Sequence, residues 1–347
     1  MKITKKKLSS FASPYSICSA NVKGETVLFA GSEVINGELI VCSGKELTPR
    51  TLAKGPGGYM GLIPLESFDF PAIAVAEGLH TNFQSVNAGI SIYSAGKDAR
   101  NLWNRHRIAD LAYIHRIALV SANGKKTIIA ASLCGRKEGP DDWSSPGAVY
   151  AVQIQRGEHV TKHKKNLLLN GITRNHGMYV QRKRGQEIVF ISGDEGVFKI
   201  HVPRAEKEWI IDKIIEQPVS ELALMDFDED GKDEIVTIQP FHGDKACIYK
   251  NMAGKWETVC ELKTEFGHGI WAGRIGGKNA FILGSRARKR DLCLYTIEDT
   301  RSWNLKKTII EAGTGTAQID VLKFNGRDLI AATNGYIDEV AVYEVTN

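Results

Sequence analysis

The chain has 347 residues, of which 43% are hydrophobic, 24% charged and 8% aromatic, and its formal net charge is +5 at pH 7. This composition is that of a globular protein with a large core, which excludes a disordered or collagen-like chain. Lysine and arginine are scattered along the sequence instead of forming a stripe. Charge therefore does not indicate a nucleic-acid partner, and it slightly favours an anionic ligand.

The N-terminal segment and the hydropathy of the chain favour a cytoplasmic protein. The opening MKITKKKLSSFASPYS is basic but lacks the apolar stretch of about 7–15 residues that a secretory signal needs. No run of about 18 apolar residues occurs, so we expect no membrane contact. The six cysteines are widely spaced without a C-x-x-C pair, which favours buried thiols over disulfides or zinc knuckles.

Short β-branched runs recur seven times along the chain, and each is followed by a loop and a second strand-like run. The first runs are TVLFAGS (26–32), AIAVAEG (72–78), TIIAASL (127–133), EIVFISG (187–193), EIVTIQP (234–240), AFILGS (280–285) and LIAATNG (329–335). The second runs align on Val41, Tyr93, Tyr150, Lys199, Tyr249, Tyr295 and Tyr343. Successive aligned positions are 46 to 57 residues apart.

A period near 50 residues, with several strands per period and almost no helical pattern, is typical of four-stranded propeller blades. Inner strands precede the first runs of blades 2 to 7, at 59–65, 115–121, 177–183, 220–226, 269–275 and 317–323. Only six polar outer strands follow the second runs. We therefore expect residues 2–10 to supply the missing outer strand of the last blade, which removes an exposed sheet edge.

The sequence thus predicts an all-β fold, a seven-bladed β-propeller with four-stranded blades, whose ring is closed by the N-terminal strand. Residues 1–347 form a single propeller domain in this interpretation. The alternative is an open β-sandwich or two small β domains.

Histidines gather on one face of the predicted ring. With strands labelled A (inner) to D (outer), the D–A and B–C connections lie on one face and the A–B and C–D connections on the other. His115, His176 and His268 begin A strands, whereas His80 and His242 lie in B–C loops. Strand starts lie close to the axis, so we expect these imidazoles to converge in the central funnel as a catalytic or metal-binding cluster. For each histidine alone, a satisfied polar residue near a loop is the simpler interpretation.

Four further side chains on this face are candidates for substrate binding. They are Arg136, Trp143, Arg286 and Tyr336. Arginine and tyrosine suit a hydroxylated or anionic ligand such as a sugar.

A local motif, DFDEDGKDE (226–234), predicts a structural cation on the opposite face. Its spacing places carboxylates at positions 1, 3, 5 and 9 of an EF-hand-like loop, a glycine at position 6 and a carbonyl ligand at position 7. The predicted ligands are Asp226, Asp228, Asp230, Lys232 through its carbonyl, and Glu234. Oxygen ligands at this spacing fit calcium, or magnesium with extra waters. An acidic turn without an ion is the alternative.

The sequence DFDEDGKDEIV resembles the FG-GAP (VCBS) repeat of seven-bladed propellers, and only blade 5 keeps the motif intact. With its segments EGLHTN, NHGM and EFGHGIWAG, the whole chain resembles the propeller domain of aldos-2-ulose dehydratases, which remove water from 1,5-anhydrofructose and related sugar ketones. The cupin domains of those enzymes have no counterpart here. The chain is also similar to oligogalacturonate lyases, propellers whose funnel holds a metal through histidines.

Both resemblances imply β-elimination, which needs a base for the proton next to a carbonyl and an electrophile for the enediolate. We expect a carbon–oxygen lyase or dehydratase acting on a small ketosugar, with His115, His176 and His268 as base, acid or ligands and His80 and His242 assisting. A zinc or manganese ion in the funnel belongs to the second form of this site, a metal-dependent oligouronide lyase. A propeller that binds a glycan or protein without catalysis is the other alternative.

Overall fold

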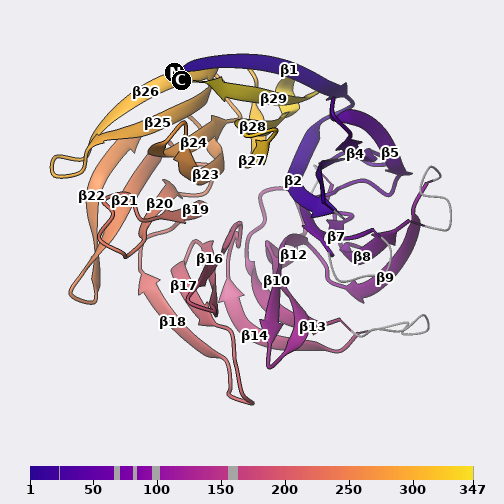
Figure 1. Cartoon of the computed structure of the whole chain (residues 1–347). Helices are drawn as coiled ribbons and strands as arrows, with labels where there is room; N and C mark the ends of the chain where they lie inside the picture. The colour runs from indigo at the N-terminus through magenta and orange to yellow at the C-terminus, as the bar shows by residue number, and fades with distance from the viewer. Residues whose placement is uncertain (23, 66–70, 81–83, 96–101, 155–162, 347) are drawn as a thin grey trace.

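The structure is a computed structural model that describes residues 1–22, 24–65, 71–80, 84–95, 102–154 and 163–346. Within these residues the strands form seven antiparallel sheets, arranged as a ring around a central axis (Figure 1). This confirms the predicted seven-bladed β-propeller. No helix of the described chain is long and apolar enough to cross a membrane.

Five blades each consist of four consecutive strands, from the inner strand A to the outer strand D. Blade 1 contains β2 (Pro14–Val22), β3 (Glu25–Ser32), β4 (Glu38–Ser43) and β5 (Thr48–Lys54), and blade 2 contains β6 (Gly61–Pro64), β7 (Ala72–Glu77), β8 (Gly89–Ser94) and β9 (Asn104–Asp110). Blade 4 contains β15 (Gly177–Lys183), β16 (Gln186–Gly193), β17 (Gly196–His201) and β18 (Ile210–Ile215). Blade 5 contains β19 (Glu221–Met225), β20 (Glu234–Gln239), β21 (Lys245–Met252) and β22 (Lys255–Lys263), and blade 6 contains β23 (Gly267–Ile275), β24 (Lys278–Ser285), β25 (Leu292–Asp299) and β26 (Asn304–Glu311).

Blades 3 and 7 depart from this pattern. Blade 3 contains β10 (Ile114–Ala122), β11 (Lys125–Ser132), β13 (Ser145–Gln153) and β14 (Lys165–Ile172), with a short extra strand, β12 (Cys134–Arg136), paired to the start of β13. Blade 7 takes β27 (Thr316–Phe324), β28 (Arg327–Asn334) and β29 (Glu339–Thr346) from the end of the chain, with a 3-10 turn, η1 (Gly335–Ile337), before β29. Its outer strand is β1 (Lys2–Ser10).

The pairing of β1 with β29 closes the ring. The two strands are antiparallel, with Lys2 opposite Thr346 and Ser10 opposite Glu339, and the two chain ends lie together (Figure 1). Lys5 also reaches Glu311 of β26 and Glu339 of β29, each at 2.7 Å. The closing strand therefore ties blade 7 to its neighbour and covers the outer edge of β29.

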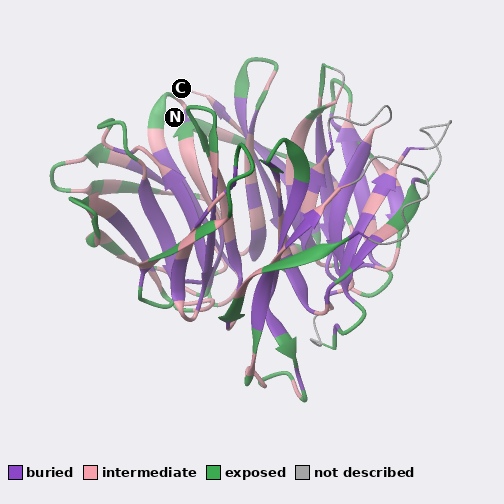
Figure 2. Ribbon diagram, turned by 90° about the horizontal axis from the view of Figure 1, so that it is seen from below, coloured by how far each residue is buried: buried purple, intermediate pink, exposed green. Residues whose placement is uncertain are grey.

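Burial is highest in the second strand of each blade and lowest in the outer strands, and the described part of the ring has a buried interior with exposed turns and edges (Figure 2). All six residues of β20 are buried, because neighbouring blades pack on both faces of a central strand. In the outer strand β18 only Ile215 is buried. The apolar first runs are thus the second strands of the blades, and the polar outer strands follow as predicted. The sequence interpretation assigned no inner strand to blade 1, and β2 fills that position.

Candidate functional site

Three inner strands begin with a β-bulge that turns one side chain toward the axis. The pairing shifts between Pro14 and Ser16 in β2, between Ile114 and Arg116 in β10, and between Gly267 and Gly269 in β23. The residues inside these bulges are Tyr15, His115 and His268. A bulge inserts an extra residue and re-aims its side chain, which is common at rims and beside active sites. Strand register and bulge together bring these side chains to the centre.

The two other histidines of the cluster come from connections. His176 immediately precedes β15, and its backbone N–H donates to the Ser192 carbonyl at 3.1 Å. His242 lies between β20 and β21 with a φ of +48°, in the left-handed region that is costly for a residue with a side chain. Backbone strain of this kind concentrates at functional sites.

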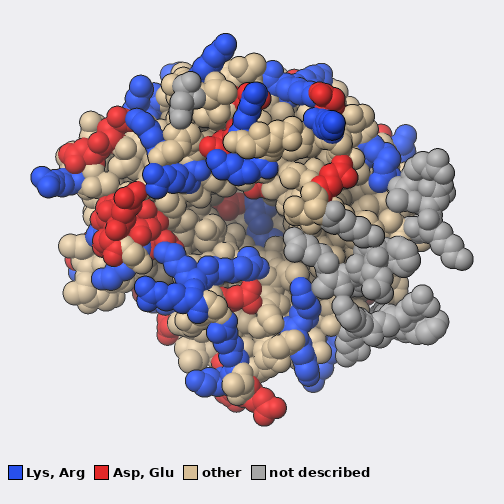
Figure 3. Space-filling view, viewed as in Figure 1, with Lys and Arg blue, Asp and Glu red and all other residues tan. Residues whose placement is uncertain are grey.

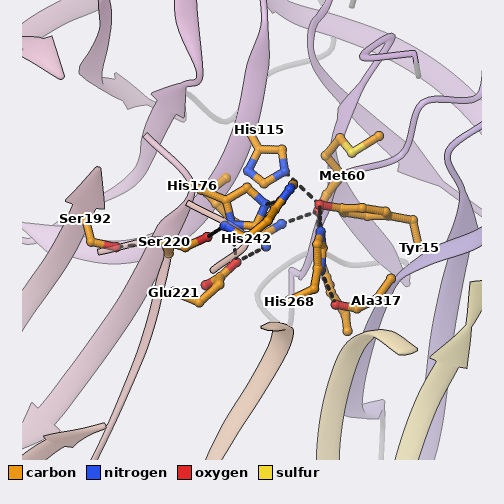
Figure 4. A network of polar contacts seen from close by, with 12 residues as sticks. Tyr15, Met60, His115, His176, Ser192, Ser220, Glu221, His242, His268 and Ala317 are labelled. Atoms are coloured by element: carbon orange, nitrogen blue, oxygen red, sulfur yellow. Dashed lines mark hydrogen bonds and ion pairs between the residues drawn. The ribbon is translucent and has the colours of Figure 1, made fainter. Parts of the chain in front are cut away.

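The four imidazoles and the Tyr15 phenol form one compact cluster (Figure 4). The ring centre of His176 lies 4.2 Å from that of His115 and 4.9 Å from those of His242 and His268. The Tyr15 hydroxyl lies 2.8 Å from Nε2 of His115 and 3.3 Å from Nε2 of His268. Blades 1, 3, 4, 5 and 6 all contribute, so the cluster exists only in the closed ring.

These side chains line a cavity of about 220 Å³ at the axis. Its walls are Tyr15, Glu33, Met60, Leu79, His80, His115, Leu133, His176, Phe241, His242, His268 and Arg286. All five predicted histidines and the predicted Arg286 are therefore at one cavity. His80 is half-buried at its edge.

Two buried ion pairs border the cavity and leave it without net charge. Arg286 contacts Glu33 at 2.6 Å, which joins blade 6 to blade 1, and Arg116 pairs closely with Glu221. Burial, reinforced by neighbouring positive groups, holds the pKa values of His115, His242 and His268 well below the ordinary value.

Proton positions follow from the same burial. Burial also lowers the pKa of His176, although the nearby Glu221 opposes the shift. The cluster consequently consists of neutral imidazoles at neutral pH, each with a nitrogen lone pair available to a proton or a metal. Burial raises the pKa of Tyr15 to about 12, so its hydroxyl keeps its proton.

Three of the imidazoles have the arrangement of metal ligands. His176, His242 and His268 each offer a ring nitrogen, and these nitrogens lie within 4.8 Å of one another. Nε2 of His176 and Nε2 of His242 are 3.3 Å apart, close to the separation of about 3.4 Å between two ligands in a tetrahedral zinc site with bonds of about 2.1 Å. Nδ1 of His268 faces the Ala317 carbonyl at 2.8 Å, the kind of outer contact that orients ligating histidines. An all-imidazole set suits zinc better than manganese.

The remaining substrate-binding candidates lie away from the cavity. Arg136 is exposed and pairs with Glu138 at 3.3 Å. Tyr336 is 61% exposed, with the guanidinium of Arg290 3.6 Å from its ring centre. Trp143 packs edge-on against the cavity residue Phe241, with ring centres 5.5 Å apart, so it supports the wall from behind.

The acidic loop between β19 and β20 already contains a positive charge. The ammonium of Lys250, from β21, lies 2.5 Å from Asp228, 2.8 Å from Asp230 and 3.0 Å from Glu234. Burial opposes protonation, but these carboxylates outweigh it and raise the pKa of Lys250. Sequence reasoning did not include Lys250, because it comes from a different strand.

The loop nevertheless keeps features of a cation site. Asp226, Asp228 and Glu234 each present an oxygen within 4.8 Å of the others, and one buried oxygen each of Asp226 and Asp228 has no hydrogen-bond partner. The backbone N–H of Lys232 donates to Asp230 at 2.8 Å, so Asp230 also closes the turn. Hard oxygen donors of this kind fit calcium or magnesium, which stay predictions for this loop.

Sequence reasoning missed the side chains that organise the cavity: Tyr15, Glu33, Arg116 and Glu221. Tyr15 occupies the inner-strand position of blade 1 that His115 and His268 occupy in blades 3 and 6. Aligning the inner strand of blade 1 with the others would have found it. Glu221 is the first residue of β19. Its contact with His176 of the neighbouring blade becomes visible only in the assembled ring.

The axis also holds a second cavity, of about 280 Å³, beyond the histidines. It shares Met60 and His268 with the histidine cavity, and its walls include Arg116, Glu221 and Trp271. Viewed along the axis, the molecule has a central hollow with lysine and arginine gathered around it (Figure 3). Arg116 and Glu221 line the second cavity and are absent from the walls of the first.

Comparison with known proteins supports the fold alone. No protein-family model matches the chain, and no curated protein matches its sequence significantly. Similar solved structures include BBS1N in complex with ARL6DN, at 12% identity and TM-score 0.58 over 99% of this chain and 96% of that one. The propeller domain of Cps50 (Swd1) from Myceliophteria thermophila matches at 11% identity and TM-score 0.59, over 98% and 99%. The WD40 propeller domain of Doa1 matches at 11% identity and TM-score 0.56, over 98% and 97%.

Proposed function

We propose that the histidine cavity is the active site of a carbon–oxygen lyase that dehydrates a small ketosugar, such as 1,5-anhydrofructose, by β-elimination. One observation carries this proposal: four neutral imidazoles and a protonated phenol meet in a single cavity at the axis. Buried imidazoles are costly to gather without a use, and perturbed titratable groups in a cavity are typical of functional sites.

The groups present can perform the proton transfers of this reaction. A neutral imidazole removes the proton next to the carbonyl, and the hydroxyl on the next carbon leaves as water once it receives a proton. The Tyr15 phenol and its partner His115 are placed to supply that proton. Arg286 lies at the wall, where its guanidinium can stabilise the developing enediolate oxygen.

The proposal extends to a zinc ion held by His176, His242 and His268. When bound, such an ion supplies a Lewis acid that polarises the substrate carbonyl. In this form His115 keeps the proton-transfer role with Tyr15, whose hydroxyl lies closer to Nε2 of His115, at 2.8 Å, than to Nε2 of His268, at 3.3 Å.

The size of the cavity favours a single sugar over an oligouronide. Its volume of about 220 Å³ is below the range of about 300–1,000 Å³ typical of sites for drug-sized ligands. An oligosaccharide would have to extend beyond the walls of this cavity.

The acidic loop supports a relation to FG-GAP propellers, with calcium or magnesium as a structural ion in blade 5. Its carboxylates lie on a different part of the fold from the imidazoles, in the A–B connection of a single blade. We propose that an ion there stabilises the fold and takes no part in turnover.

A non-catalytic binding propeller is the second candidate. It is favoured by the similarity to BBS1N, which was solved in complex with ARL6DN. In that case the imidazoles would only hold a ligand or stiffen the axis.

The test is turnover against a panel of ketosugars and uronides, with zinc added or chelated, followed by the ultraviolet absorbance of the unsaturated product. We expect product from a monosaccharide-sized ketosugar. Binding of a panel member without any product would favour the binding propeller, and product from oligouronides alone would favour the oligouronide lyase.

A further inference from the structure

Glu221 lies at the junction of the histidine cluster and the second cavity. It is the first residue of β19, and its side chain is 7% exposed. One carboxylate oxygen, Oε1, contacts both the Arg116 guanidinium and Nδ1 of His176, the latter at 2.8 Å (Figure 4). A buried carboxylate thus connects a fixed positive charge to one imidazole of the proposed active site.

The contact with His176 determines where the imidazole carries its proton. The Arg116 guanidinium, a permanent positive charge, pairs directly with Oε1 of Glu221 and favours the ionised carboxylate. An ionised carboxylate only accepts hydrogen bonds, so the ring nitrogen beside it must carry the hydrogen. Nδ1 of His176 and Oε1 of Glu221 are within hydrogen-bond distance at 2.8 Å, although the N–H is not directed squarely at the oxygen.

We propose that Glu221 is a positioning residue that keeps the proton of His176 on Nδ1 and directs the lone pair of Nε2 toward His242 and the cavity. Arg116 in turn fixes Glu221. This inference rests on the proposed function, because it explains how one imidazole of that site is prepared to act as a ligand or a base.

The surroundings of Nε2 of His176 explain why its protonation state affects the proposed site. Nε2 of His176 lies 3.3 Å from Nε2 of His242, so a hydrogen on the His176 nitrogen would point at its neighbour. Only the Nδ1–H form offers a lone pair there. Outer-shell carboxylates of this kind change metal affinity by about 10–100-fold when they are removed.

The variants are Glu221→Gln, which removes the acceptor-only carboxylate, and Glu221→Asp, which keeps the charge beside Arg116 but withdraws it from His176. Glu77→Gln is the matched control. Glu77 is also a fully buried carboxylate paired with arginines, Arg105 at 2.6 Å and Arg107 at 3.2 Å, but it lies in blade 2, which contributes none of the four clustered imidazoles. Its loss should cost comparable stability without altering the cluster.

Two measurements test the proposal. Nitrogen-15 NMR of labelled histidine reports the tautomer of His176 without any metal or substrate: we expect Nδ1–H in the wild type and a mixture with Nε2–H in Glu221→Gln. Titration with cobalt(II) reports the lone pair: we expect affinity about 10–100-fold lower in Glu221→Gln, an intermediate loss in Glu221→Asp and no change in Glu77→Gln.

An unchanged His176 tautomer in both Glu221 variants would overturn the positioning role. Equal cobalt affinity in folded Glu221→Asp and wild type would do the same. These outcomes test the positioning role alone. The proposed function is tested separately, by product formation in the wild type. If Glu221→Gln does not fold, the Glu221→Asp spectra decide the question.

Discussion

The axial histidine cluster and the acidic loop of blade 5 are both collections of ligand-type side chains, and they differ in how their charges are met. In the loop, three carboxylates surround the ammonium of Lys250 at 2.5 to 3.0 Å. At the axis, the arginines are paired with Glu33 and Glu221, and the imidazoles are left neutral with lone pairs facing one another. The negative charge of the loop is neutralised by a side chain of the same blade. The neutral imidazoles instead offer lone pairs that a proton or a metal ion could occupy.

The two regions also depend differently on the fold. The acidic loop and Lys250 lie within one blade, between β19 and β21. The cluster takes side chains from five blades, and Tyr15 belongs to the blade beside the ring closure. The compact sequence motif therefore corresponds to the acidic loop, which one blade forms by itself. The residues scattered along the sequence correspond to the histidine cluster, which needs five blades of the closed ring.

Removal of residues 2–10 should have the largest effect and should separate the two regions. Without β1, β29 loses its partner, and the contacts of Lys5 with Glu311 and Glu339 are lost. We expect a broadened thermal transition at lower temperature and loss of cobalt binding at the axis, since the cluster needs the closed ring. An unchanged melting curve would show that the closing strand does not hold the ring.

The pH dependence of stability should also distinguish the regions. Folded His115, His242 and His268 have pKa values well below the ordinary 6.5, so the unfolded chain takes up more protons as the pH falls below 6.5. Stability should be complete above pH 6.5 and decline between about pH 6.5 and 5, by up to about 1.4 kcal/mol per pH unit for each buried imidazole.

Asp230 of the acidic loop should respond at lower pH than the imidazoles. Hydrogen bonding, first of all to Lys250, lowers the pKa of Asp230, so its contribution is present above the ordinary 3.8 and is lost below it. Urea unfolding from pH 8 to below pH 3.8 provides the measurement, and His115→Gln should flatten the first decline. A wild type equally stable at pH 7 and 5 would contradict neutral buried imidazoles.

The smallest expected effect is the response of the loop to calcium. In the wild type the ion must displace the Lys250 ammonium, so we expect a small rise in melting temperature with millimolar calcium. Lys250→Met leaves the carboxylates unbalanced and should melt lower in chelator, with a larger rise when calcium is added. Lys245→Met, on the same strand but paired at the surface with Glu261 at 3.3 Å, is the control. No calcium response in any of them would refute a structural ion.

The fold could be predicted because the same pattern of apolar and polar strands occurs in every blade. Each blade has a central strand packed on both faces, which requires an apolar run such as 234–240, and polar outer strands punctuate these runs at a regular interval. The sequence also indicated that the histidines of the A strands share a face and a radius. The inner strand of blade 1 was not predicted, and Tyr15 was missed with it.

The rest of the site depends on local backbone irregularities and loop conformations, which the repeat of about 50 residues does not predict. The bulges at Tyr15, His115 and His268 decide whether these side chains face the axis or the next blade. Ion pairs between distant residues, such as Glu33 with Arg286, arise from loop conformation. Exposed residues such as Arg136 and Tyr336 lie on the same face of the propeller as the histidines but farther from its axis. Their place on that face therefore did not predict contact with a substrate in the axial cavity.

The central claim is that the axial imidazoles, and not the acidic loop, carry the chemistry. The most direct measurement compares the rate of ketosugar elimination by the wild type, His176→Ala, Asp228→Ala and His201→Ala, the last a histidine paired with Asp212 on the outer side of blade 4. We predict a loss of about 10²-fold or more in His176→Ala and rates near the wild type in the other two. A folded His176→Ala with wild-type turnover, or loss of turnover in a folded Asp228→Ala, would contradict the claim.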